Sequence, residues 1–375
     1  MKIAIDALGI HYFGGGRSAT LNLLKALFAI DNGYRYRVFL TQPEPELVAP
    51  GKVEQVVAPV KNRLAVRAWA QARLPALVHD CNLVHFMKNL GVFGVGRPTV
   101  VTMYDLTTLV YPELLPKLDV WYWQTVQKWT LQQAQRVIAI SENTARDVER
   151  FYAIQRARID VIYPACAATF QPASAAEIER VRAAYGLAGR YILHLGRLDR
   201  KKNASQLVLA YAALRQLTGY TGKLVFVGEE YSKGVDHQLY AVIRERGLGE
   251  QVQFTGAAPD ADLPAMVSAA EVAVMTSLHE GFGIVALEAM ACGAPVVVNR
   301  AGAVHEVVGD AGIVLDGRST EDLVHALLLV TQQPQAREWM SRQGLRQAAR
   351  FDWRTAACAT LDTYRKAVEV KDELP

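Results

Sequence analysis

Short apolar runs alternate with longer amphipathic stretches along the first part of the chain. A short apolar run bounded by turn residues is typical of a buried strand, and apolar residues at every third or fourth position are typical of a helix. The first pair is a strand at 2–7 followed by a helix at 18–30. Further strands are predicted at 36–40, 83–86, 99–103, 137–140 and 160–163. Strands that alternate with helices indicate a mostly parallel, doubly wound sheet.

The same pattern starts again after residues 165–176, a stretch with Pro172 and several small residues that we interpret as a linker. The clearest helices of this second part are at 203–217 and 262–270, and the chain is mainly helical from about residue 321. The predicted strands are 191–195, 223–227, 252–255, 272–276, 295–299 and 312–315. This pattern predicts a second sheet of the same kind.

The length supports two domains, because 375 residues exceed one ordinary hydrophobic core. We predict an α/β protein with Rossmann-like doubly wound domains at 1–168 and 169–354. A final helix at about 355–375 can pack back on the first domain. Two such domains are expected to face an interdomain cleft, and clefts of this kind are favoured ligand sites.

The composition disfavours membrane-spanning, secreted and nucleic-acid-binding proteins. Half of the chain is hydrophobic, yet no apolar stretch reaches the length of a membrane span, and Asp6 lies where a signal peptide would be apolar. Four scattered cysteines fit reduced thiols, so we expect a cytoplasmic protein. The net charge of +4 is mild and spread along the chain, which disfavours nucleic acid as a partner.

Two glutamates, Glu280 and Glu288, surround a glycine turn between a predicted strand and a predicted helix. In an open α/β sheet such a turn lies at the carboxyl end of a strand, where ligands bind and where free helix N–H groups attract an anion. Glu280 would meet this ligand from the loop. Glu288, about one turn into the helix, would present a carboxylate to hydroxyl groups. Both residues are placed to bind a sugar.

Each domain has a further glycine loop, which follows its first predicted strand. The triplet that includes Gly15 and Gly16 lets the backbone approach a diphosphate, but it lacks the dinucleotide spacing, which disfavours a nicotinamide enzyme. The second loop, which begins at Gly196, carries Arg197 and Lys202, and both cations can reach one anion. A planar guanidinium beside a compact ammonium suits the two phosphates of a nucleoside diphosphate.

These motifs together resemble those of the family-four retaining glycosyltransferases of GT-B fold. The resemblance covers nearly the whole chain and is most specific in the second half. It implies that Arg197 and Lys202 bind the donor diphosphate, that Glu288 binds the ribose, and that Gly15 and Gly16 close on the phosphates from the other domain. It also implies that the transferred sugar is bound by Glu280 with the backbone of Gly281, Phe282 and Gly283. The residues that carry it are 196–198 with Lys202 and Asn203, 280–283, and 288–297.

One position departs from the family pattern. The strand at 99–103 commonly ends in a His-Asp pair in this family, with the histidine near the donor sugar, whereas here Tyr104 precedes Asp105. A tyrosine can still donate a hydrogen bond, but its ordinary pKa near 10 makes it a poor proton shuttle at neutral pH. A different donor sugar, an altered geometry or a reduced activity would each be compatible with Tyr104.

Three other features of the sequence bear on its function. Asp260 and Asp262 form an Asp-x-Asp pair, but they precede a predicted helix and we interpret them as a helix cap, so no metal is expected. His11 has little support as a catalytic group. The basic, apolar helix at 61–74 either docks on an anionic membrane or, as we favour, packs on its own domain.

The sequence therefore predicts a retaining, metal-independent hexosyltransferase without a cofactor. It would move a mannose- or glucose-type sugar from a GDP- or UDP-linked donor to a saccharide or lipid-linked acceptor in polysaccharide or glycan biosynthesis. Glu280, Arg197, Lys202 and Tyr104 are the predicted catalytic residues. We expect it in the cytoplasm, with peripheral contact at the inner membrane face left open. Two alternatives remain: a sugar-nucleotide epimerase of the same fold, and a non-catalytic subunit that binds a nucleotide sugar.

Overall fold

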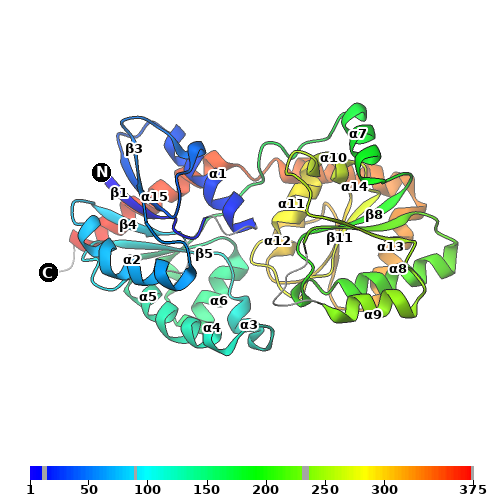
Figure 1. Ribbon diagram of the computed structural model, residues 1–375, viewed down its shortest axis with the longest axis horizontal. Coiled ribbons are helices and arrows are strands. Elements are labelled where there is room, and N and C mark those ends of the chain that lie inside the picture. Colours follow the sequence, from blue (N-terminus) through cyan, green and yellow to red (C-terminus); the bar gives the residue numbers. More distant parts are fainter. Residues whose placement is uncertain (11–14, 88–90, 230–235, 373–375) are drawn as a thin grey trace. The chain divides into compact units, whose positions relative to one another are not determined.

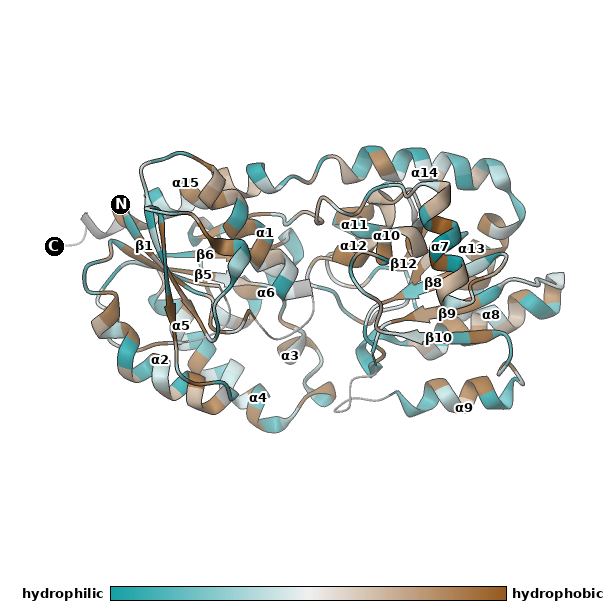
Figure 2. Ribbon diagram, turned by 45° about the horizontal axis from the view of Figure 1, so that its top comes forward, coloured by the Kyte–Doolittle hydropathy of each residue, from teal (hydrophilic) through white to brown (hydrophobic). Residues whose placement is uncertain are grey.

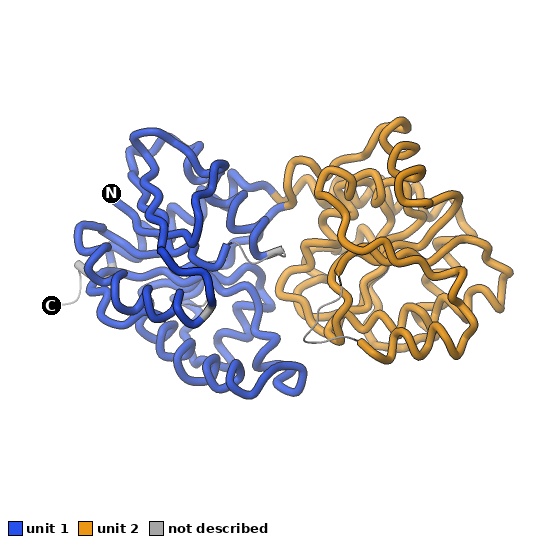
Figure 3. The backbone as a smooth tube through the Cα atoms, in the orientation of Figure 1, with its two compact units in different colours: residues 1–165, 352–375 blue, residues 166–351 orange. Residues whose placement is uncertain are grey.

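The computed structural model describes residues 1–10, 15–87, 91–229 and 236–372 (Figure 1). The chain divides into two compact units (Figure 3). Unit 1 consists of Met1–Ala165 with Asp352–Pro375, and unit 2 consists of Cys166–Phe351. The boundaries predicted from the sequence, 168 and 354, lie within three residues of these.

Unit 1 contains a seven-stranded parallel sheet in the order β3-β2-β1-β4-β5-β6-β7. The order reverses beside β1, as in other doubly wound sheets. The strands are β1 Lys2–Asp6, β2 Arg35–Leu40, β3 Val53–Val57, β4 Leu83–Phe86, β5 Thr99–Met103, β6 Arg136–Ala139 and β7 Ile159–Val161.

One strand of unit 1, β3, was not predicted. It pairs only with β2 and forms the edge of the sheet. Its sequence, Val-Glu-Gln-Val-Val, mixes polar and apolar residues because an edge strand is half exposed, so it gives no continuous apolar run.

Helices cover both faces of this sheet because neighbouring strand residues point to opposite sides. Ile3 and Ile5 pack with α1 and α15, whereas Ala4 packs on the face covered by α2, α5 and α6. The last helix, α15, thus belongs to unit 1, and its Tyr364 hydroxyl lies 2.7 Å from Nδ1 of His85 in β4. The helices are α1 Gly15–Ala29, α2 Arg63–Leu77, α3 Thr107–Val110, α4 Lys117–Tyr122, α5 Lys128–Gln133, α6 Glu142–Tyr152 and α15 Trp353–Asp372.

Unit 2 contains a six-stranded parallel sheet in the order β10-β9-β8-β11-β12-β13. All six strands were predicted. They are β8 Tyr191–Leu195, β9 Lys223–Val227, β10 Val252–Gly256, β11 Val272–Met275, β12 Val296–Asn299 and β13 Ile313–Leu315.

The predicted linker at 165–176 is wrong at its end, because α7 begins at Ala175. The Ser174 side chain accepts from the Glu177 backbone while Glu177 reaches back to Ser174, a capping box that starts a helix. Helices α8 and α13 pack on one face of the sheet. The helices are α7 Ala175–Tyr185, α8 Ala204–Thr218, α9 His237–Glu245, α10 Leu263–Ser268, α11 Ile284–Ala291, α12 Val304–Val308, α13 Thr320–Gln332 and α14 Pro334–Ala348.

The strands of both sheets are mainly hydrophobic, and hydrophilic residues colour the outer sides of helices such as α2 and α14 (Figure 2). Among the residues described, no helix combines the length and the apolar character that a membrane crossing requires.

Candidate active site

The carboxyl end of the unit 2 sheet brings together Lys202 and Glu280, which are 78 residues apart in the sequence. The Lys202 ammonium donates to Oε1 of Glu280 at 2.6 Å, and each side chain is 15% exposed. The Ser277 hydroxyl donates to the same oxygen at 2.6 Å. Both charged residues were predicted as ligand-binding residues, but their pairing with each other was not predicted.

Local contacts explain why these two loops meet. Lys202 ends the 3-10 turn Arg200–Lys202, which the Asp199 carboxylate caps by accepting from the Lys202 backbone N–H at 3.2 Å. The Leu278 N–H donates to the Lys201 carbonyl at 2.8 Å, so the loop after β11 is attached to this turn. The two attached loops hold the charged ends of Lys202 and Glu280 side by side.

Two glycines that the sequence analysis did not single out allow the close approach of backbones in this region. A Cβ on Gly228, after β9, would lie 2.0 Å from the carbonyl oxygen of Gly196, after β8. A Cβ on Gly302, after β12, would lie 2.2 Å from the carbonyl oxygen of Glu280. Both glycines have positive φ, so any other residue would be strained as well as crowded.

The Glu280 carboxylate is strongly held in its ionised form. Burial alone would raise its pKa, but the charges of Lys202 and Lys201 and the hydrogen bonds from Lys202 and Ser277 lower the pKa of Glu280 to about 2. Glu280 is therefore an acceptor of hydrogen bonds at neutral pH in the free protein, which suits contact with sugar hydroxyls.

Glu288 lies in α11, one turn after its start, and has the opposite character. Burial and the neighbouring charge of Asp260 raise the pKa of Glu288 to about 8, although Lys202 acts in the opposite direction. Its side chain has no hydrogen-bond partner among the residues described, so a ligand hydroxyl group could supply one. The Phe282 side chain is buried and packs edge to face against Phe351, so that a ligand contact by Phe282 would have to use its backbone.

Arg197 follows β8 and is largely exposed, with its guanidinium 3.5 Å from the Asp199 carboxylate. The prediction placed Arg197 and Lys202 on one anion. The structure places both at the same end of the sheet, where Lys202 is paired with Glu280 and Arg197 lies beside Asp199. A bound diphosphate would have to compete with Glu280 for Lys202.

The equivalent end of the unit 1 sheet carries hydroxyl groups instead of charges. The Thr20 hydroxyl in α1 donates to the Gly16 carbonyl at 2.8 Å and lies 2.8 Å from the Tyr104 hydroxyl, which follows β5. Because the only Thr20 hydroxyl hydrogen is given to Gly16, the Tyr104 hydroxyl must donate to Thr20. Burial raises the pKa of Tyr104 to about 12. Tyr104 thus acts as a hydrogen-bond donor in this structure, with Thr20 as its acceptor, and its predicted catalytic role stays a prediction.

The region also contains a buried histidine, His194 in β8. Burial, together with the charge of Lys202, lowers the pKa of His194 to about 4. Its Nδ1 is 3.2 Å from the Val274 carbonyl, and its Nε2 has no hydrogen-bond partner in the part of the chain that the structure describes. The ring is therefore neutral, and its centroid lies 5.3 Å from that of the Phe226 ring.

The helix cap predicted at Asp262 is wrong. The Asp262 side chain does not cap α10; it accepts from Arg180 at 2.7 Å and from the Tyr185 hydroxyl at 2.8 Å. Asn203 precedes α8 in a left-handed conformation, and its side chain donates to Gln206 instead of capping the helix. His11 and Gly14 lie outside the described residues, while Gly15 begins α1.

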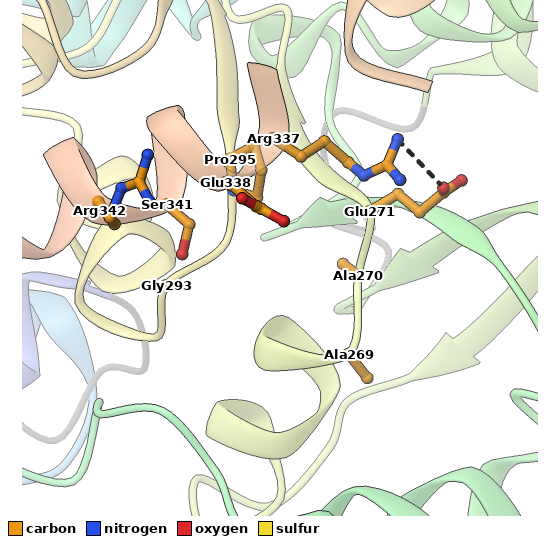
Figure 4. A pocket seen from close by; sticks show the side chains of 9 residues that line it. All are labelled: Ala269, Ala270, Glu271, Gly293, Pro295, Arg337, Glu338, Ser341 and Arg342. Atoms are coloured by element: carbon orange, nitrogen blue, oxygen red, sulfur yellow. Dashed lines mark ion pairs between the residues drawn. The ribbon is translucent and has the colours of Figure 1, made fainter. Parts of the chain in front are cut away.

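A separate pocket of about 500 Å³ opens at the other end of the unit 2 sheet (Figure 4). Its lining includes Glu271 and Pro295, which precede β11 and β12, and an ion pair joins Glu271 to Arg337 across 3.9 Å. None of the predicted site residues lines it. Ligands of open α/β sheets bind outside the carboxyl ends of strands, so we assign the candidate active site to Lys202, Glu280 and Glu288.

Comparison with protein families gives two matches that follow one another along the chain. Residues 177–347 match the model of the glycosyl transferases group 1, and residues 13–168 match that of Glycosyltransferase Family 4. The first match contains Arg197, Lys202, Glu280 and Glu288, and the second contains Tyr104.

Two similar proteins illustrate the relationship. The chain is 33% identical over 268 residues to the O-antigen chain mannosyltransferase B of Escherichia coli, an alignment that covers 71% of this chain and 70% of that protein. It is 30% identical over 253 residues to the D-inositol 3-phosphate glycosyltransferase of Corynebacterium urealyticum, covering 65% of this chain and 60% of that protein. The chain thus spans less than two thirds of the second relative's length.

Solved structures resemble the chain over nearly its whole length. The Anabaena protein HepE in complex with UDP and glucose aligns with a TM-score of 0.79 at 21% identity, covering 97% of this chain and 99% of that one. WaaG, a glycosyltransferase involved in lipopolysaccharide biosynthesis, aligns with a TM-score of 0.74 at 19% identity, covering 96% and 98%. These likenesses confirm the predicted fold of two Rossmann-like, doubly wound domains.

Proposed function

This chain belongs to the glycosyl transferases of group 1 and has their GT-B fold, and on that premise we propose the reaction that its candidate site performs. The protein moves a hexose from a nucleoside diphosphate sugar to a saccharide or lipid-linked acceptor in glycan biosynthesis. The observation that carries this proposal is the Lys202–Glu280 pair at the carboxyl end of the unit 2 sheet. It places a cation for a diphosphate beside an ionised carboxylate for a sugar.

Each charged group has a proposed task. The diphosphate takes Lys202 from Glu280 and is met by Arg197, while the released Glu280 carboxylate accepts hydrogen bonds from the hydroxyls of the transferred sugar. When the bond between the sugar and the diphosphate breaks, negative charge grows on the leaving group. Lys202 and Arg197 stabilise that charge, and one such donor is typically worth about 3 kcal/mol in the transition state.

Glu288 is the proposed ribose ligand. Its raised pKa means that much of it is protonated at neutral pH in the free protein. A neutral carboxyl group offers one donor and one acceptor, which matches two neighbouring ribose hydroxyls. We further propose that the reaction retains the anomeric configuration and needs no metal, because cationic side chains supply the charge that a divalent ion supplies elsewhere.

The similarity to the mannosyltransferase of Escherichia coli supports mannose as the transferred sugar, with GDP-mannose as the first donor to test. The HepE complexes with UDP and UDP-glucose make UDP-glucose the second. The name of the same relative supports a saccharide acceptor of the O-antigen type. A lipid-linked acceptor would place the enzyme at the inner face of the membrane.

Donor turnover tests the proposal. Purified protein is incubated with GDP-mannose or UDP-glucose, with and without oligosaccharide acceptors, and release of the nucleoside diphosphate is followed. We expect release that depends on the acceptor and falls at least about a hundredfold in Lys202→Ala. An epimerised sugar without acceptor, or tight donor binding without any turnover, would contradict transfer and support an epimerase or a binding subunit.

A further inference from the structure

A second cavity of unit 2 lies beside helix α14 and shares no residue with the pocket of Figure 4. Its volume is about 350 Å³, which falls in the range of about 300–1,000 Å³ that small-ligand sites occupy. We call it the α14 cavity. Its lining comes from α14, from the residues just after this helix and from the loop that follows α12, and it includes Asp310, Trp339, Gln343, Arg346, Gln347 and Arg350.

The sequence of α14 explains why the helix carries a cavity on each flank. Met340, Gly344 and Ala348 recur at every fourth position and form its buried side. A Cβ on Gly344 would lie 3.3 Å from the Met290 side chain of α11, so the glycine lets the two helices pack closely. The flanks on either side of this buried stripe are left for polar residues, and one of them also carries Trp339.

Trp339 gives the α14 cavity an aromatic surface. The residue is 47% exposed, although it lies among polar neighbours. An indole combines a flat apolar body with a single N–H donor. A pyranose ring has the complementary form, because its C–H groups make an apolar face and its hydroxyls form a polar rim. A sugar can therefore stack on Trp339 while its hydroxyls meet the polar lining.

The fold leaves polar groups of this lining available to a ligand. In the part of the chain that the structure describes, the side chains of Asp310, Gln343 and Arg346 make no hydrogen bond or ion pair. Gln347, in contrast, is held in place, because it donates to the Val307 carbonyl at 2.9 Å and accepts from Arg350 at 3.1 Å. A carboxylate, an amide and a guanidinium together offer acceptors and donors, which matches hydroxyl groups that do both.

Helix α12 connects the α14 cavity to the candidate active site. The Ala303 N–H, just before α12, donates to the Glu280 carbonyl at 2.9 Å, and Gly309, which ends α12, lines the cavity. The five residues of α12 span only about 7.5 Å. An adjoining cavity of about 470 Å³ shares Gly309 and Asp310 and is also lined by Arg300, which follows β12 at the carboxyl end of the sheet.

We propose that the α14 cavity binds the saccharide chain of the acceptor, several sugars away from the one that reacts. The two adjoining cavities give such a chain a polar path between the carboxyl end of the unit 2 sheet and Trp339. A simple anion suits the cavity less well, since its arginines are accompanied by the Asp310 carboxylate and an indole. The inference deepens the proposed function, on which it rests for the idea that the bound saccharide is the acceptor.

Saccharide binding without a donor tests the cavity directly. Trp339 is the only one of the six tryptophans that belongs to unit 2. The full chain, labelled with ¹⁵N in its indole groups, is titrated with mannopentaose and with maltopentaose. The Trp339 signal in the NMR spectrum is identified by its absence from Trp339→Phe. We expect at least one of the two oligosaccharides to shift this signal in a saturable manner.

Variants that keep Trp339 show whether the polar lining contributes. Gln343→Ala and Arg346→Ala should each weaken the binding about threefold to tenfold, because each removes hydrogen bonds to sugar hydroxyls. Ser341→Ala is the matched control, since Ser341 lies in the same helix but lines the pocket of Figure 4, and it should bind as the wild type does.

Three results of this titration would overturn the proposal. The first is a Trp339 signal that neither oligosaccharide moves. The second is a loss in Ser341→Ala as large as that in Gln343→Ala. The third is a Trp339 signal that inorganic phosphate moves at a lower concentration than either oligosaccharide, which would make the cavity an anion site.

Transfer assays separate this inference from the proposed function. In Trp339→Ala we expect the KM for a long oligosaccharide acceptor to rise about tenfold, while kcat and the KM for a monosaccharide acceptor stay unchanged. An unchanged KM for the long acceptor would contradict the inference and leave the proposed transfer intact. Oligosaccharide binding at Trp339 by a protein that turns over no donor would contradict the proposed reaction but not the saccharide site.

Discussion

The carboxyl ends of the two sheets have the same architecture but different chemistry. In unit 2 the loops after β8 and β11 join an ammonium to a carboxylate, Lys202 to Glu280. In unit 1 the end of β5 and the start of α1 are joined by two hydroxyls, those of Tyr104 and Thr20. A doubly wound sheet therefore fixes where a site lies, and the loops decide what that site can bind.

The difference also concerns stability. A largely buried ion pair seldom stabilises a fold more than apolar residues of the same size would, because both charges lose water. A neutral hydrogen bond between two hydroxyls has a much smaller penalty. The charged pair of unit 2 is thus better explained by ligand binding than by folding, and the hydroxyl pair of unit 1 by the positioning of α1 next to β5.

The largest effect is expected from Lys202→Ala, which breaks the unit 2 pair. It leaves the Glu280 carboxylate buried without its cation, and such uncompensated charges typically lower the free energy of unfolding by about 3–5 kcal/mol. Urea denaturation measures this loss. Arg200→Ala, in the same 3-10 turn, is the matched control and should change stability far less, because the Arg200 side chain is exposed. If Lys202→Ala were as stable as the wild type, the proposed energetic cost of leaving Glu280 unpaired would be contradicted.

The second largest effect is a difference in pH dependence: Glu288 and Glu280 of unit 2 should change the stability of the protein in different pH ranges. Glu288 has a raised pKa of about 8, so its ionisation opposes folding as pH rises from its ordinary pKa of 4.5 through about 8. Glu288→Gln should therefore raise the melting temperature relative to wild type more at pH 8.5 than at pH 5. Thermal unfolding followed by circular dichroism measures the difference.

Glu280 is the control for that experiment because its pKa is shifted in the opposite direction. Its lowered pKa, about 2, gives stability that is present above pH 4.5 and is lost as pH falls towards 2. Glu280→Gln should be less stable than wild type at pH 7, and the difference should shrink in acid. If both variants showed the same pH dependence, the assignment of opposite ionisation states would be wrong.

The smallest effect is expected in unit 1. Tyr104→Phe removes one hydrogen bond to Thr20 and should lower the free energy of unfolding by about 1 kcal/mol. Donor affinity, measured by calorimetry, should change less than about threefold, since the hydroxyl already donates within unit 1. Thr20→Val should have a similar effect. If Tyr104→Phe lowered the free energy of unfolding as much as Lys202→Ala does, the proposed difference between the charged sheet end of unit 2 and the neutral sheet end of unit 1 would be contradicted.

Much of the fold was predictable because parallel strands buried on both sides give clear apolar runs. The edge strand β3 was not predicted because it lacks such a run. The start of α7 was predicted wrongly because the capping box of Ser174 and Glu177 was not recognised. The site motifs were predictable as local patterns.

The way in which these motifs meet was not predictable. The Lys202–Glu280 pair and the contact of Thr20 with Tyr104 join residues 78 and 84 positions apart. Gly228 and Gly302 matter only because other backbones approach them, which no local pattern reveals. Such contacts depend on the order of strands in the sheet, and strand order lies beyond what apolar periodicity specifies.

A crystal structure of the protein with the nucleoside diphosphate sugar that it turns over tests the central claim most directly. The account predicts the diphosphate on Lys202 and Arg197 of unit 2, the ribose hydroxyls on Glu288, and the Glu280 carboxylate turned from Lys202 to the sugar. A diphosphate bound elsewhere, with the Lys202–Glu280 pair still intact at 2.6 Å, would contradict it.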